Sequence, residues 1–142
     1  MHLKTDFIEK LRHSGLRPTK QRLKICDALF NADKTFHFTI NDLSKIIREK
    51  LNEKISLATV YNTVHAFEKK GYLKEISINS NQTYFDTNTS SHHHFFDEKE
   101  KKLIDLENED VDPININKSI PGKKIKSIEV LVKLDSENQR SE

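Results

Sequence analysis

Residues 55–73 have the sequence ISLATVYNTVHAFEKKGYL, which predicts one capped helix with a defined end. Ser56 is a residue type favoured at the N-cap, the position just before the first helical residue. Gly71 follows two lysines, and both glycine and positive charge are favoured where a helix ends. Apolar residues recur at helical spacing from Leu57 to Phe67, so the helix has one face suited to burial.

The opposite face of this predicted helix is polar but carries little charge. It presents Ala58, Thr59, Tyr61, Asn62, His65 and Lys69. A helix that is buried on one side and offers hydrogen-bonding groups on the other can lie in the major groove of DNA. An ordinary surface helix has the same pattern, so the rest of the chain must distinguish the two interpretations.

The neighbouring segments predict three shorter helices before this one and a β-hairpin after it. The helices are expected at residues 3–13, at about 20–31 with Thr19 as N-cap, and at about 40–51 with Thr39 as N-cap. Residues 35–38 are expected to be an apolar connector, and the hairpin strands are Tyr72–Ile78 and Gln82–Asp86. Four helices followed by a hairpin predict a winged helix-turn-helix domain over residues 1–86, which favours DNA binding.

The two parts of the chain differ in charge. Residues 1–83 contain 15 Lys and Arg against 9 Asp and Glu, a net charge of +6, whereas residues 84–142 contain 9 against 13, a net charge of −4. A basic part suggests contact with a polyanion. Arg17, Lys20 and Arg22 stand at the start of the second predicted helix, where positive charge opposes the helix dipole. We expect them to contact phosphates; a solvated basic cluster is the alternative.

The second part of the chain predicts a small, mainly extended domain. Residues 87–91 are polar and form the expected hinge, and the domain covers residues 92–142 with a disordered tail from about 135. Strands are expected at residues 92–96, 103–106 and 125–134. A lobe of this size has too little core to be stable alone, so we expect it to pair with a second copy of the chain.

The histidines that follow the hinge predict a metal site. If residues 92–96 are extended, His92 and His94 point to the same side and lie about 6.5 Å apart, close enough to bind one ion. Asp86 and His37 are the candidates for further ligands, although a packed core histidine is the simpler interpretation of His37 alone. Three nitrogens and one carboxylate oxygen suit Zn²⁺, Fe²⁺ or Mn²⁺, and haem is a further candidate ligand for the cluster. A chance triplet is the alternative.

Several classes of protein are not supported by the sequence. Charged residues make up 32% of the chain, and no apolar run approaches the roughly 20 residues of a membrane span. The N-terminus has no signal-peptide pattern, and the single cysteine, Cys26, excludes an internal disulfide. Hydrolase and phosphate-loop motifs are absent. We therefore expect a cytoplasmic protein that is not an enzyme and does not bind membranes.

Four segments together resemble the ferric uptake regulator family of metal-responsive transcription factors. They are GLRPTKQR at residues 15–22, SLATVYNTV at 56–64, TYFD at 83–86 and HHH at 92–94. The segments YFDTN at 84–88 and HHHFF at 92–96 are most similar to the iron response regulator branch. The resemblance implies an α+β homodimer in which each chain has an N-terminal winged helix and a small C-terminal α/β dimerisation domain.

The resemblance also implies roles for particular residues. The family's interdomain metal site maps onto His37, Asp86, His92 and His94, and a second site would use His93 but lacks its C-terminal histidine partner. The CxxC zinc motif of many members is absent here, where Asp97 and Glu100 stand instead. The Cys-Pro motif linked to haem sensing is also absent, because Cys26 is followed by an aspartate.

The sequence thus predicts an iron- or haem-responsive regulator that binds an AT-rich palindromic operator in double-stranded DNA as a homodimer. The expected DNA-contacting residues are Arg17, Thr19, Lys20, Arg22, Thr59, Tyr61, Asn62 and His65. The alternative is a metal- or haem-binding protein whose winged helix acts through protein contacts and does not bind DNA. The direction in which an effector changes DNA affinity is not predicted.

Overall fold

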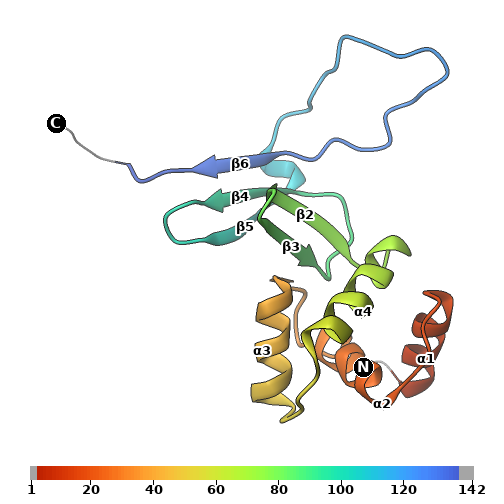
Figure 1. The fold of residues 1–142 in the computed structure, drawn as a ribbon. Helices are drawn as coiled ribbons and strands as arrows, with labels where there is room; N and C mark the ends of the chain where they lie inside the picture. The colour runs from red at the N-terminus through yellow and green to blue at the C-terminus, as the bar shows by residue number, and fades with distance from the viewer. Residues whose placement is uncertain (1–2, 138–142) are drawn as a thin grey trace. The chain divides into compact units, whose positions relative to one another are not determined.

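The computed structural model describes residues 3–137, and the chain divides into two compact units with the boundary between Thr89 and Ser90 (Figure 1). The first unit contains four helices: α1 Lys4–His13, α2 Lys20–Phe30, α3 Ile40–Lys50 and α4 Leu57–Lys69. Its antiparallel sheet has the strand order β1-β3-β2, with β1 His37–Phe38, β2 Lys74–Asn79 and β3 Gln82–Asp86. The predicted four helices and hairpin are confirmed.

Side-chain caps begin three of these helices where the sequence predicts them. Thr19 and Ser56 accept hydrogen bonds from the backbone N–H groups of Arg22 and Thr59. At α3, Thr39 accepts from the N–H of Asp42, and the Asp42 carboxylate accepts from the N–H of Thr39. Each cap satisfies a backbone donor that has no partner inside the helix.

The end of α4 is fixed by Gly71. This residue has a φ of +84°, a conformation that glycine adopts without steric cost. Its N–H donates to the carbonyl of Glu68, and the next N–H, of Tyr72, donates to the carbonyl of Phe67. These two bonds form a Schellman motif, and they set the direction in which the chain leaves α4 for β2.

The core of the first unit is apolar and draws on every one of its helices. Its members include Leu11, Ile25, Leu29, Phe38, Leu43, Ile47, Val60, Val64, Phe67 and Phe85. The prediction for α4 was wrong at one position: Leu57 is 51% exposed, and Thr63 is buried in the helix instead. The Thr63 hydroxyl donates to the carbonyl of Thr59, which removes the cost of burying a polar group there.

Strand β1 was not predicted. Residues 35–38 were expected to be a connector, but His37 and Phe38 pair with Asp86 and Phe85 of β3. A strand of two residues is too short to show the alternation by which strands are recognised in a sequence. The pairing places His37 directly opposite Asp86, the two residues of this unit that the sequence predicts as metal ligands.

The second unit is a three-stranded sheet with the order β5-β4-β6. Strand β4 His93–Asp97 pairs antiparallel with β5 Lys102–Leu106 and parallel with β6 Leu131–Leu134. The only helix in the described part of this unit is a 3-10 turn at Asn108–Asp110. The strand expected at 125–134 was wrong over residues 125–130, because ladder pairing begins only at Leu131.

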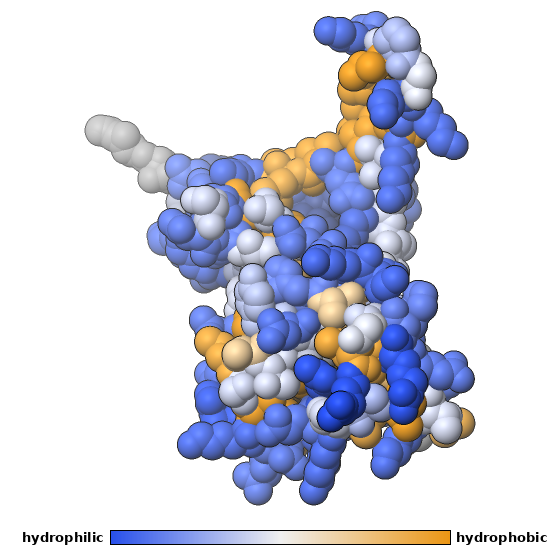
Figure 2. Space-filling model, turned by 45° about the vertical axis from the view of Figure 1, so that its right-hand side comes forward, coloured by the Kyte–Doolittle hydropathy of each residue, from blue (hydrophilic) through white to orange (hydrophobic). Residues whose placement is uncertain are grey.

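The segment between the 3-10 turn and β6 exposes apolar side chains. Ile114, Ile116, Ile120 and Ile125 are 38–64% exposed, and Figure 2 shows apolar side chains along this segment. The tail expected from about 135 falls largely on residues 138–142, which lie outside the described residues. Among the described helices, none has the length and apolar character needed to cross a bilayer.

Candidate metal centre and nucleic-acid interface

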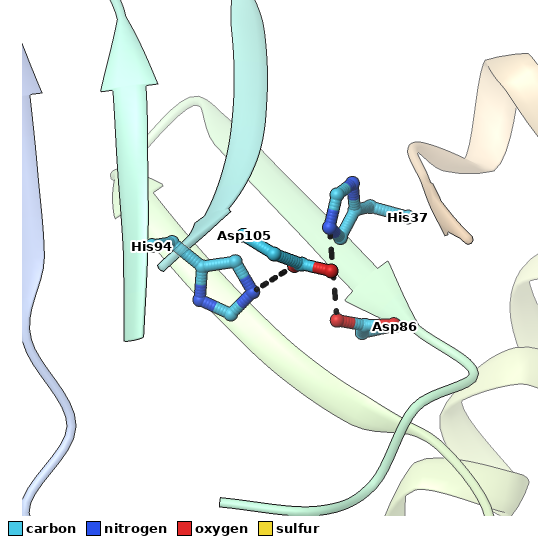
Figure 3. A group of neighbouring side chains, drawn as sticks. All are labelled: His37, Asp86, His94 and Asp105. Atoms are coloured by element: carbon cyan, nitrogen blue, oxygen red, sulfur yellow. Dashed lines mark ion pairs between the residues drawn. The ribbon is translucent and has the colours of Figure 1, made fainter. Parts of the chain in front are cut away.

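The first unit brings together one histidine and one carboxylate from neighbouring strands. The Nε2 atom of His37 lies 3.8 Å from Oδ2 of Asp86 (Figure 3). The other carboxylate oxygen, Oδ1, accepts a hydrogen bond of 2.8 Å from the N–H of Asn88. The backbone therefore holds Asp86 so that Oδ2 faces the imidazole.

The second unit brings together two histidines and a carboxylate that the sequence analysis missed. The Nε2 atoms of His92 and His94 lie 3.3 and 3.4 Å from the same oxygen, Oδ1 of Asp105, and Figure 3 shows His94 turned toward Asp105. The two imidazole rings are 4.4 Å apart, centroid to centroid. The expectation that His92 and His94 point to the same side is confirmed.

The ring of His92 is oriented by the backbone. Its Nδ1 atom lies 2.7 Å from the carbonyl oxygen of Ser90. A carbonyl can only accept, so Nδ1 must carry the proton, and in the neutral ring the lone pair is then on Nε2, which faces Asp105. Histidine ligands of metals are commonly held in this way by a second hydrogen bond.

His93 lies in a different environment from its neighbours. Its Nδ1 atom accepts a hydrogen bond of 2.9 Å from the backbone N–H of Val130, next to β6. This bond ties the last strand to β4, so His93 has a structural role. The prediction that His93 also serves as a ligand stays a prediction, and it would require the bond from Val130 to break, because in a neutral ring whose Nδ1 accepts, Nε2 carries the proton.

Asp105 could have been found from the hairpin register. In β4 and β5, His94 pairs with Asp105 and Asp97 pairs with Lys102 across a tight turn. Directly opposite residues in an antiparallel pair share one face of the sheet. The sequence prediction placed the two strands but did not align them, and so the carboxylate opposite His94 was not recognised.

The predicted phosphate-contacting residues gather at the start of α2, where several are held by local hydrogen bonds. Thr19 is the N-cap, and its hydroxyl accepts from the N–H of Arg22 at 3.3 Å. The Arg22 guanidinium donates to the carbonyl of Arg17 at 3.0 Å. Arg17 and Lys20 are exposed, whereas Thr19 and Arg22 are half-buried. Arg17 and Lys20 are therefore the freest of this group to reach a phosphate.

The predicted base-reading face lies on α4. Tyr61 is 51% exposed, Asn62 is exposed and His65 is half-buried. The ring centroids of Tyr61 and His65 are 4.1 Å apart, so each ring restricts the movement of the other. The hydroxyl of Thr59 is 2.9 Å from that of Ser56, within the cap of the helix. Tyr61 and Asn62 are thus the most exposed side chains of the set.

Comparison with known proteins relates this chain to one family of regulators. The Ferric uptake regulator family matches residues 13–133. The chain is 32% identical over 105 residues to the peroxide operon regulator of Bacillus subtilis (strain 168), covering 74% of this chain and 70% of the relative. It is 31% identical over 113 residues to the peroxide-responsive repressor PerR of Staphylococcus epidermidis, covering 80% of this chain and 73% of the relative.

Solved structures show the same fold. The ferric uptake regulator of Pseudomonas aeruginosa with manganese superimposes with a TM-score of 0.67 at 19% identity, covering 93% of this chain and 98% of that one. The Campylobacter jejuni peroxide stress regulator gives a TM-score of 0.59 at 20% identity, covering 99% and 100%. The α+β fold class is confirmed.

A helical unit with a wing, followed by a small sheet bearing histidine and carboxylate side chains, is the architecture of metal-responsive regulators of transcription. The chain belongs to the ferric uptake regulator family, whose members are DNA-binding homodimers and not enzymes. The narrower resemblance to the iron response regulator branch is unconfirmed, since the relatives named above are peroxide regulators.

Proposed function

We propose that this chain is a cytoplasmic, homodimeric transcriptional repressor whose effector is one divalent transition-metal ion held jointly by the two units. The proposed ligands are His37, Asp86, His92, His94 and Asp105. The observation that carries the proposal is the approach of two imidazole nitrogens to a single carboxylate oxygen, Oδ1 of Asp105.

This arrangement calls for a cation. Because Nδ1 of His92 donates to Ser90, the Nε2 atom directs a lone pair toward the Asp105 oxygen 3.3 Å away. Two electron-rich atoms at this distance repel each other unless a proton or a metal ion lies between them. A metal ion satisfies both atoms at once, whereas a proton satisfies them only when the imidazole is charged.

The ligand chemistry fits the metals of the family. Imidazole nitrogen and carboxylate oxygen suit Zn²⁺, Fe²⁺ and Mn²⁺, and the solved relatives include one with manganese and a zinc-bound manganese uptake regulator. We propose Fe²⁺ as the effector in the cell and iron genes as the targets. Haem is an alternative occupant of the histidine cluster, and its absorption spectrum would reveal it.

Shared binding of one ion can be tested by removing ligands from each unit in turn. We expect the wild type to bind about one metal ion per chain more than either His37→Ala or His94→Ala does, because neither unit alone completes a site with four ligands. Metal content after dialysis measures this. Two independent sites would instead lose binding only on the substituted side, and unchanged content in both variants would refute the proposal. Glu98→Gln, an exposed carboxylate of the second unit, is the control.

We propose that α4 enters the major groove, with Tyr61 and Asn62 at base edges and Arg17, Lys20 and Arg22 at phosphates. The operator is proposed to be AT-rich and palindromic, because a two-fold symmetric dimer matches a two-fold symmetric site.

The phosphate contacts can be tested with Lys20→Ala. This change should weaken DNA binding and reduce the slope of log affinity against log salt concentration by about one. Lys34→Ala, in an exposed loop, is the control. Binding that is insensitive to salt would support the alternative function through protein contacts.

Peroxide sensing is a second candidate function. It is favoured by the similarity of this chain to a peroxide operon regulator and a peroxide-responsive repressor, at 32% and 31% identity. It predicts that hydrogen peroxide releases the iron-loaded protein from its operator but leaves the zinc-loaded protein bound. Equal release of both forms, or of neither, would argue against it.

A further inference from the structure

A second group of metal-ligand side chains lies entirely within the first unit. It consists of His65 and Glu68 on α4 and Glu75 on β2, and one ligand atom from each lies within 4.8 Å of the others. His65 and Glu68 are three residues apart on the helix, a spacing that places both side chains on one face. None of these three residues belongs to the metal centre described above.

The charge at this cluster is not balanced by basic side chains. Over residues 3–137, no Lys or Arg forms an ion pair with Glu68 or Glu75. Two carboxylates at this separation repel each other, and a cation between them removes the repulsion. The imidazole of His65 supplies a nitrogen donor beside them, so the cluster is a mixed nitrogen and oxygen set.

The cluster is built on rigid elements. The ring of His65 lies 4.1 Å from that of Tyr61 and meets Phe85 edge-on at 5.4 Å with an interplanar angle of 82°. Glu75 pairs directly with Phe85 across β2 and β3, so both side chains are on the same face of the sheet. The backbone between α4 and β2 is fixed at Gly71 by the Schellman motif. Ligands held by packed elements are already positioned for binding.

We propose that His65, Glu68 and Glu75 bind a divalent transition-metal ion within the DNA-binding unit. One imidazole and two carboxylates suit Zn²⁺, Mn²⁺ or Fe²⁺, with water completing the coordination. Metal–ligand distances of about 2.0–2.2 Å require only a small movement of the glutamate side chains from the separations in the structure.

This site would act directly on DNA recognition, an extension that rests on the proposed function of α4. Metal binding neutralises the negative charge of Glu68, on the helix that is proposed to face DNA, and that of Glu75 on β2, which favours association with the phosphate backbone. It also fixes His65, whose ring contacts Tyr61, and so restrains a proposed base-contacting side chain. We therefore expect DNA affinity to rise when the site is filled.

The site is tested in the full chain carrying His92→Ala and His94→Ala, which removes two ligands of the first centre. Zn²⁺ is the probe, and the bound metal is counted after equilibrium dialysis. We expect about one Zn²⁺ per chain in this background and its loss when Glu68→Gln and Glu75→Gln are added. Glu9→Gln with Glu49→Gln, two exposed carboxylates on α1 and α3, is the matched control and should retain the ion.

The results separate this site from the proposed function. Absence of Zn²⁺ from the background variant, or equal binding with and without the Glu68 and Glu75 substitutions, would overturn the site. Co²⁺ provides a second readout that does not depend on DNA. Its visible absorption bands in the His92→Ala, His94→Ala background should disappear when His65→Ala is added. If Zn²⁺ binds as expected but leaves operator affinity unchanged, the coupling to α4 is wrong while the site stands.

Discussion

At the scale of single residues, the structure shows how neighbours determine what a side chain can do. Among three consecutive histidines, His92 donates to a carbonyl and, like His94, faces Asp105, whereas His93 accepts from Val130 and ties β6 to the sheet. The sequence identifies the residue type, but the hydrogen bond on the second ring nitrogen decides whether a histidine is available as a ligand.

Asp105 is the residue that the two histidine nitrogens of the second unit's proposed ligand set both approach. Asp105→Asn removes the negative charge while keeping the size of the side chain, so we expect metal affinity to fall by about tenfold or more. Competition with a chromophoric chelator measures the change. Asp110→Asn, an exposed aspartate in the same unit, should bind as the wild type does. Equal affinities in all three proteins would remove Asp105 from the site.

Cys26 is expected to be chemically inert in the folded protein. Burial raises the pKa of its thiol to about 12, so the reactive thiolate is scarce at neutral pH. Iodoacetamide should label Cys26 slowly at pH 8 in buffer and much faster in urea, where the pKa returns toward its ordinary value. Mass spectrometry follows the labelling. Rapid labelling without urea would show that the core around Cys26 opens.

The raised pKa of the Cys26 thiol also makes the free energy of unfolding depend on pH. Folding keeps the proton on Cys26, so the unfolded chain ionises first as the pH rises. The contribution of this thiol to the free energy of unfolding is fully present below about pH 9. It is lost as the pH rises from there to about 12.

At the scale of secondary-structure elements, helix boundaries were more predictable than strand pairing. The caps Thr19, Thr39 and Ser56 act locally, so the residue type alone indicated where each helix begins. Strand β1 and the end of β6 depend on partners far away in the chain, and Asp105 was missed for the same reason. The predicted burial of Leu57 was wrong for a different reason, since the spacing of apolar residues cannot show where the buried face of a helix ends.

The cap of α3 gives a quantitative test. Thr39→Ala removes the acceptor for the N–H of Asp42 and one half of the reciprocal pair. We expect a loss of about 1 kcal/mol in the free energy of unfolding. Urea unfolding followed by circular dichroism measures it. Asn41→Ala, exposed in the first turn of the same helix, should change stability by less. A loss equal to that of the control would show that the cap contributes nothing.

At the scale of the whole molecule, the second unit has few buried apolar residues of its own. Phe96, Leu103 and Leu106 are buried, whereas the segment before β6 exposes several isoleucines. A unit of this size usually needs a partner to cover such surface. The family relationship makes a second copy of the chain the expected partner.

The isoleucines before β6 are therefore predicted to lie in the dimer interface. Ile116 and Ile120 are 55% and 64% exposed in the single chain. Replacing both with aspartate should shift the protein toward a monomer, because charge would be buried at the interface. Sedimentation measures the change, with Lys118→Asp on the same segment as control. A variant that stays dimeric would place the interface elsewhere.

The parallel pairing of β6 with β4 has a consequence for synthesis of the chain on the ribosome. The sheet of the first unit is complete at Asp86, so this unit can fold as soon as it emerges from the exit tunnel. The second sheet has to wait for Leu134, because an edge partner of its central strand is translated last. Domains generally fold in the order in which they are made. A nascent chain would thus acquire its helical unit before the histidines of β4 are fully enclosed, leaving an interval in which they are accessible to metal ions.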